Sequence, residues 1–185
     1  GEVLRMFVPK FDEVDQTRDK SLHDLAKIIA ETMSVHAVAT ELLEREEWDL
    51  AAIYSDAIDH FSHRFMRYHP PRQPHVPEEE FALFSGVVAN AYRYHDAMLG
   101  RYLELIGPGT HVIVLSDHGF HSDALRPGWI PVEPAGPAVE HRQHGMIVMA
   151  GPEFANGERI FGSSILDITP TLLTLFGLPV GEDMD

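Results

Sequence analysis

The chain has 185 residues, enough for one domain of ordinary size that can bury its own core. It carries 14 basic and 29 acidic side chains, a formal net charge of −15, so we expect no non-specific binding to nucleic acid or to an anionic membrane surface. The absence of cysteine excludes disulfides, thiolate metal sites and a cysteine nucleophile, and it fits a reducing, cytoplasmic location. No apolar run approaches the length of a membrane span, and no signal-peptide pattern opens the chain.

Apolar periodicity and turn residues predict an alternation of helices and short strands along the chain. The pattern predicts a helix from Ser21 to Leu43, a strand over 50–54, a long helix over 78–106, strands over 111–115 and 146–150, and a last helix from Thr169 to Gly177. In the first helix Ser21 and Asp24 form a capping signal, and in the last Thr169 is the expected N-cap. Two proline-rich stretches, 68–77 and 127–137, are predicted loops. We therefore expect one α/β domain over residues 1–185, with a mainly parallel sheet flanked by helices on both faces.

Polar clusters adjoin the three predicted strands, at residues 56–63, 116–121 and 140–145. Asp59 and His63 are four residues apart, so on a helix they share one face and can bind one ion. Asp117 and His118 are adjacent and point apart on an extended backbone, which suits ligands of two neighbouring metals. Aspartate and histidine without cysteine suit zinc, and also manganese or iron.

Other interpretations of these side chains stay open on the residues alone. Asp59 and His63 can form a solvated pair on a helix surface, and His118 can be a hydrogen-bonding histidine at the end of a strand. His141 and His144 are competing candidates for one ligand position. His121 is a candidate for contact with substrate.

Four segments in order resemble the alkaline phosphatase superfamily, and within it the type I phosphodiesterase/nucleotide pyrophosphatase group. They are Asp59-x-x-x-His63, the strand followed by residues 116–119 (SDHG), residues 141–145 (HRQHG) leading into a strand and Gly151-Pro152, and the tail from Ile165 to Pro179. The resemblance runs from about residue 49 to the end of the chain. It implies an alkaline phosphatase-like fold that is incomplete at its N-terminus, with this chain as the C-terminal portion of the catalytic domain.

The resemblance also implies roles for single residues. Asp59, His63 and His141 would hold one of two divalent ions, and Asp117 with His118 would contribute to the other. The family spacing to the following glycine favours His141 over His144, which with His121 would then line the substrate pocket. The family's threonine or serine nucleophile lies on an N-terminal segment for which no match is found here.

The implied activity is hydrolysis of a small phosphoric ester at a two-metal site with zinc as the first expectation. Sulfatase, phosphonate hydrolase and phosphomutase activities share the same metal arrangement and remain alternatives. A truncated homologue that serves as a non-catalytic binding or scaffold module is the alternative from another functional class.

Overall fold

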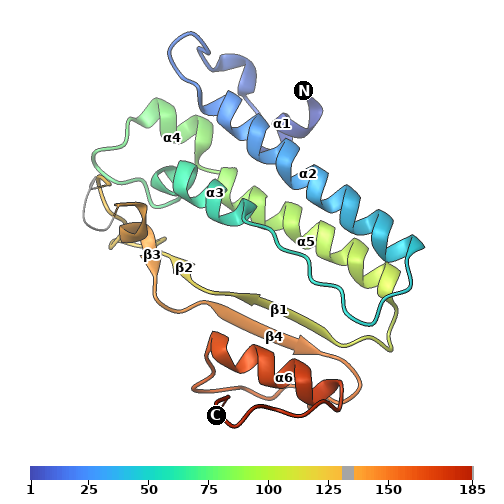
Figure 1. Cartoon of the computed structure of the whole chain (residues 1–185). Helices are drawn as coiled ribbons and strands as arrows, with labels where there is room; N and C mark the ends of the chain where they lie inside the picture. The colour runs from blue at the N-terminus through green and yellow to red at the C-terminus, as the bar shows by residue number, and fades with distance from the viewer. Residues whose placement is uncertain (131–135, 185) are drawn as a thin grey trace.

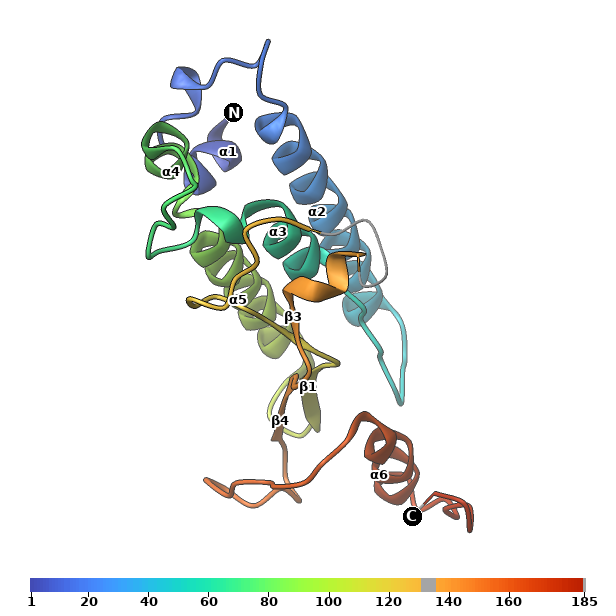
Figure 2. The same ribbon diagram turned by 90° about the vertical axis from the view of Figure 1, so that its left-hand side faces the viewer.

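The computed structural model describes residues 1–130 and 136–184. A group of five helices lies on one side of a short β-ladder, and the C-terminal helix lies on the other (Figure 1). The helices are α1 (Glu2–Phe7), α2 (Ser21–Arg45), α3 (Ala57–Phe65), α4 (Glu78–Phe84), α5 (Val87–Ile106) and α6 (Ile168–Leu175). The strands are β1 (Val112–Ser116), β2 (Gly119–Phe120), β3 (His141–Arg142) and β4 (Met146–Ala150). Short 3-10 turns are η1 (Phe11–Glu13), η2 (Met66–Tyr68), η3 (Gly136–Glu140) and η4 (Ile165–Asp167). In both views the β1–β4 ladder lies between helix α5 and helix α6 (Figures 1 and 2).

The hydrophobic core lies among the first five helices, where α2, α3 and α5 pack against one another. Phe61 and Phe65 of α3 are fully buried there, and the Phe61 ring stacks on the Phe7 ring with centroids 5.3 Å apart. By contrast, the described elements β1, β4 and α6 contain no buried residue. Helix α3 is therefore anchored firmly in the core, and the side chains on its other face have a rigid base.

Both described ladders are antiparallel, so the expected mainly parallel sheet flanked by helices is not confirmed. Strand β1 pairs with β4, with Val114 opposite Val148, and β2 pairs with β3, with Phe120 opposite His141. The predicted strand over 50–54 is wrong for this structure, in which that segment has no regular secondary structure and is exposed. A strand needs a neighbouring backbone edge, whereas residues 50–54 and the second half of α2 line opposite parts of one cavity. The chain is thus a mixed helix and strand protein with small sheets.

Two predicted helix boundaries differ from those observed. The helix beginning at Ser21 is confirmed, but Ser21 is its first residue and not its cap; the Asp19 carboxylate accepts the Ser21 backbone N–H at 2.7 Å. The pattern over 78–106 forms two helices, α4 and α5, that part at Ser85 and Gly86. Serine and glycine are poor helix formers, which permits the break at this point.

The C-terminal helix is confirmed with a different start. Ser164 and Asp167 form a capping box around η4, so Thr169 lies inside α6 and is not its N-cap. Pro170 is accommodated in the first turn, where a backbone N–H has no intrahelical partner. Gly177 ends the helix with a φ of +64°, a conformation that favours glycine.

The proline-rich stretch 68–77 is irregular after η2, as predicted. Residues 131–135 of the second predicted loop, 127–137, lie outside the described residues, and its last two residues begin η3. None of the helices in the described part of the chain is long and apolar enough to cross a bilayer.

Candidate metal centre

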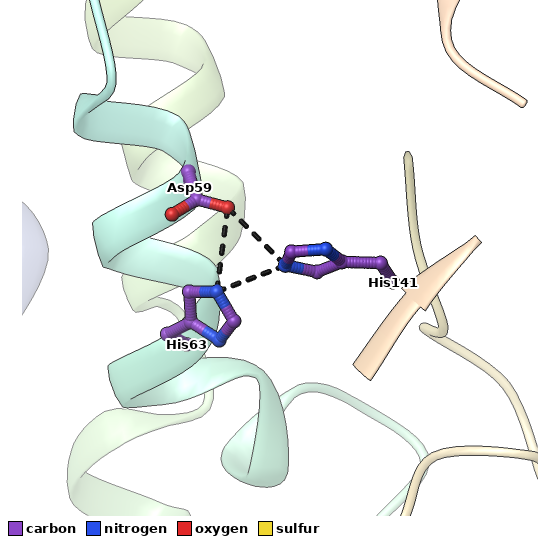
Figure 3. Close-up of side chains that lie close together, drawn as sticks. All are labelled: Asp59, His63 and His141. Carbon is purple, nitrogen blue, oxygen red and sulfur yellow. Dashed lines mark hydrogen bonds and ion pairs between the residues drawn. The ribbon is translucent and has the colours of Figure 1, made fainter. Parts of the chain in front are cut away.

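Helix α3 buries Phe61 and Phe65 in the core and carries Asp59 and His63 one turn apart. Figure 3 shows both side chains reaching from α3 towards His141. Their contact distance, from Asp59 Oδ1 to His63 Nε2, is 3.4 Å. Both side chains are partly buried, with 31% and 23% of their surfaces exposed. The i, i+4 spacing therefore does place the two groups together, on a helix that the core holds in place.

A third group reaches this pair from β3. Pairing of His141 with Phe120 in the β2–β3 ladder fixes the backbone that carries the His141 imidazole. Gly145 permits the same arrangement, because a Cβ atom there would overlap the backbone carbonyl of Ser116 at the end of β1. The chain segments after β1 and before β4 are thereby held close together beside α3.

The three side chains form a nearly regular triangle of candidate ligand atoms. His141 Nε2 lies 3.5 Å from Asp59 Oδ1 and 2.9 Å from His63 Nε2 (Figure 3). Two ligands at zinc's usual bond lengths in a tetrahedron are about 3.3 Å apart, so one ion fits between these atoms. Asp59 Oδ1 is buried and has no hydrogen-bond partner, although an unpaired buried carboxylate oxygen is costly. A cation at the centre of the group would satisfy it, and these are the residues that could hold a metal.

His118 lies against the same group, although the sequence suggested a place at a second ion. Its ring stacks on the His141 ring with centroids 3.8 Å apart, and its Nε2 lies 3.6 Å from Asp59 Oδ1. The neighbouring Asp117 carboxylate is 71% exposed and lies 3.8 Å from His118 Nε2. The described structure thus shows one compact cluster with Asp117 at its rim, and it does not show a separate second centre.

The two residues expected to line a substrate pocket lie outside the triangle. His144 is exposed in the connection between β3 and β4. His121 lies just after β2, with its backbone N–H donating to the Glu140 carbonyl at 2.9 Å. Its Nδ1 is buried without a hydrogen-bond partner, 3.9 Å from an Asp123 carboxylate oxygen.

The surroundings of His141 favour its neutral form. Burial lowers the pKa of His141, and the neighbouring His118 and His63 rings lower it further, while Asp59 and Asp117 act in the opposite direction. Only a neutral imidazole has a lone pair for a metal ion, so His141 is ready to bind at neutral pH.

Two contributors to the cluster were missed by sequence reasoning. Phe120 packs edge-on against the His63 and His141 rings, with centroids 4.9 Å away in each case. Glu140 contacts the ring nitrogen of His63 that is not part of the triangle, with its Oε2 2.7 Å from His63 Nδ1. A carboxylate directly before His141 was the only signal for Glu140, and nothing in the pattern distinguished Phe120 from other phenylalanines.

Comparison with known proteins gives the cluster its context. The family model described as type I phosphodiesterase / nucleotide pyrophosphatase matches residues 5–147. The chain belongs to this family. The matched range contains every candidate site residue named above, and the expected resemblance is thereby confirmed.

Two curated relatives also match part of this phosphodiesterase-family chain. A 2,3-bisphosphoglycerate-independent phosphoglycerate mutase of Rhodopirellula baltica is 31% identical over 91 residues, which are 48% of this chain and 16% of that protein. The enzyme of the same name from Cereibacter sphaeroides is 35% identical over 92 residues, 48% of this chain and 17% of that protein. The chain therefore spans only a small part of the length of these relatives. No solved structure matches significantly.

Proposed function

We propose that this chain is the metal-binding portion of a metal-dependent enzyme that hydrolyses phosphoric esters. The observation that carries the proposal is the triangle of Asp59, His63 and His141, with its unpaired buried carboxylate oxygen. Membership of the type I phosphodiesterase / nucleotide pyrophosphatase family supports the substrate class. Zinc suits the donor set best, and manganese and iron are compatible with it.

Asp59, His63 and His141 would hold the ion, which when bound supplies positive charge that polarises a phosphoryl oxygen. This matters in a chain of net charge −15, which by itself repels an anionic ester. Asp59 supplies the negative ligand, the two imidazoles supply neutral ones, and Phe120 excludes water from one side of their rings. We assign Asp117 and His118 to a second ion, and His144 and His121 to substrate contacts; the nucleophile would come from a segment outside this chain.

Phosphomutase chemistry is a second candidate, because both relatives are named as phosphoglycerate mutases. Hydrolysis and phosphoryl transfer to a sugar acid differ in the acceptor, which is water in one case and a substrate hydroxyl in the other. The metal-binding residues proposed here serve either reaction. The two candidates therefore differ in the acceptor and not in the residues assigned to the metal.

Turnover of bis(p-nitrophenyl) phosphate, p-nitrophenyl phosphate and p-nitrophenyl sulfate should be compared on the chain loaded with zinc or manganese. Where the chain turns these esters over without the assigned nucleophile, we expect the phosphate esters to be preferred over the sulfate, with activity lost on chelation and in His141→Ala. His60→Ala is the matched control, since His60 lies on the same helix with its side chain 47% exposed and should leave turnover unchanged.

Preference for the sulfate ester would overturn the assignment in favour of a sulfatase. Zinc-dependent binding of inorganic phosphate, measured by calorimetry, serves as the second readout, because the nucleophile is assigned to another segment. If the metal-loaded chain shows no turnover and binds no phosphate, the result would support the non-catalytic binding or scaffold module instead.

A further inference from the structure

Glu140 is a nearly buried carboxylate whose one side-chain hydrogen bond in the described structure is to His63. Its Oε2 lies 2.7 Å from His63 Nδ1, while the residue is only 8% exposed. No arginine or lysine of the described residues pairs with it. A buried carboxylate is costly unless it is hydrogen-bonded, so the bond to His63 stabilises Glu140 in this buried position.

The contact fixes which nitrogen of His63 carries the proton. A carboxylate only accepts hydrogen bonds, so His63 Nδ1 must donate and the lone pair must be on Nε2. That Nε2 faces Asp59 Oδ1 at 3.4 Å and His141 Nε2 at 2.9 Å, towards the centre of the triangle. A neutral imidazole in water favours the opposite form, with the proton on Nε2. Without Glu140 the lone pair of His63 would therefore face away from the other candidate ligands most of the time.

The backbone around Glu140 is held well enough to keep this geometry. Glu140 ends η3 and directly precedes β3, and its carbonyl accepts the backbone N–H of His121 at 2.9 Å. The same short segment thus delivers His141 to the triangle from one side and the Glu140 carboxylate to His63 from the other. The His63 ring on helix α3 therefore contacts His141 through Nε2 and Glu140 through Nδ1.

We propose that Glu140 is a positioning residue that holds His63 as its Nδ1–H tautomer and so prepares Nε2 to bind the metal ion. The inference rests on the proposed function, since it assigns His63 to the metal site. A carboxylate behind a metal-bound histidine fixes ring orientation and raises its basicity, and loss of such a partner typically lowers metal affinity by about 10- to 100-fold. Glu140 acts only through His63 and touches no substrate.

The first test is histidine-ring ¹⁵N NMR on the full chain in chelator, at a pH where the imidazoles are neutral. We expect His63 as the Nδ1–H tautomer in the wild type and in Glu140→Gln, whose amide oxygen still accepts, but not in Glu140→Ala. His95 is an internal reference, because its Nδ1 donates to the Ala91 carbonyl at 2.8 Å and should be unchanged throughout. Glu80→Gln is the matched control, since Glu80 pairs with Tyr68 and not with a histidine.

The second readout is zinc affinity by competition with a chromophoric chelator. Glu140→Ala should bind zinc about 10- to 100-fold more weakly than the wild type, with Glu140→Gln restoring most of the loss. A wild-type His63 found as the Nε2–H tautomer would overturn the proposal without any variant. So would a folded Glu140→Ala that keeps both the Nδ1–H tautomer and wild-type affinity. Because the tautomer is measured without metal, it separates this inference from the proposed function, which fails if the wild type binds no zinc.

Discussion

Replacing His141 with alanine should weaken zinc binding by more than about 100-fold, because loss of a ligand costs more than the 10- to 100-fold typical of an outer partner. His144→Ala, in the same short segment but exposed, should leave affinity within about threefold of the wild type. The measurement is a competition titration on both variants and the wild type. Equal, small losses in the two variants would contradict the placement of His141 at the metal.

The same titration repeated across pH tests ligation by histidine. Burial lowers the pKa of His141, so this ligand stays neutral until the pH falls below its ordinary value of about 6.5. Below that point protons compete with the metal, and affinity should fall steadily as the pH decreases towards 5. A flat affinity between about pH 5 and 8 would argue against histidine ligands.

Replacing Arg126 with methionine should lower the free energy of unfolding by about 3 kcal/mol or more, a large part of a typical domain's stability. Arg126 is only 5% exposed, and its guanidinium donates to four backbone carbonyls. They belong to Met66 at 2.9 Å, Pro71 at 2.5 Å, Asp123 at 3.2 Å, and His69. Methionine keeps much of the volume but removes the guanidinium donor. The Met66 and Asp123 carbonyls still accept from the backbone N–H groups of His69 and Arg126, whereas those of His69 and Pro71 lose their donor, at a cost of about 1–3 kcal/mol for each that stays buried.

Urea unfolding of the chelated chain, followed by circular dichroism, measures this effect. Arg142→Met is the matched control, because Arg142 is 48% exposed and pairs with Asp123 at the surface, where an ion pair contributes less than about 1 kcal/mol. Arg126→Lys keeps the charge, but its ammonium cannot reach all four carbonyls. Its unfolding midpoint should therefore lie between those of Arg126→Met and Arg142→Met. Equal midpoints for the two methionine variants would show that Arg126 does not hold the loop after α3 against the segment after β2.

The sequence predicted the elements that carry the cluster better than it predicted their assembly. Helical spacing sufficed for Asp59 and His63, because the contact between them is local to α3. The approach of His141 depends on a pairing with Phe120 and on the close backbone contact at Gly145, neither of which a one-dimensional pattern reports. Glu140 was missed for the same reason, since its partner is 77 positions away in the chain.

The sheet was the least predictable part of the fold. Apolar runs over 111–115 and 146–150 do form strands, but their antiparallel pairing follows from the return of the chain after β3 and not from their composition. The run over 50–54 is also apolar but forms no strand, because none of the described strands lies beside it to share hydrogen bonds. Arg126 is buried because its guanidinium donates to carbonyls of the loop after α3, which lies 55 to 60 positions before it in the chain.

Metal content tests the central claim most directly, and α3 offers an unusually close control. Asp56, the residue just before α3, and His60 repeat the spacing of Asp59 and His63. Both are exposed and 3.9 Å apart, and Asp56 makes no capping hydrogen bond.

Elemental analysis should therefore compare the wild-type chain, purified without chelator, with the double variants Asp59→Ala/His63→Ala and Asp56→Ala/His60→Ala. We expect at least about one equivalent of zinc, manganese or iron in the wild type and in the Asp56/His60 variant, and under one-tenth in the Asp59/His63 variant. A wild-type chain that holds less than about one-tenth equivalent and regains none from added zinc would contradict the account.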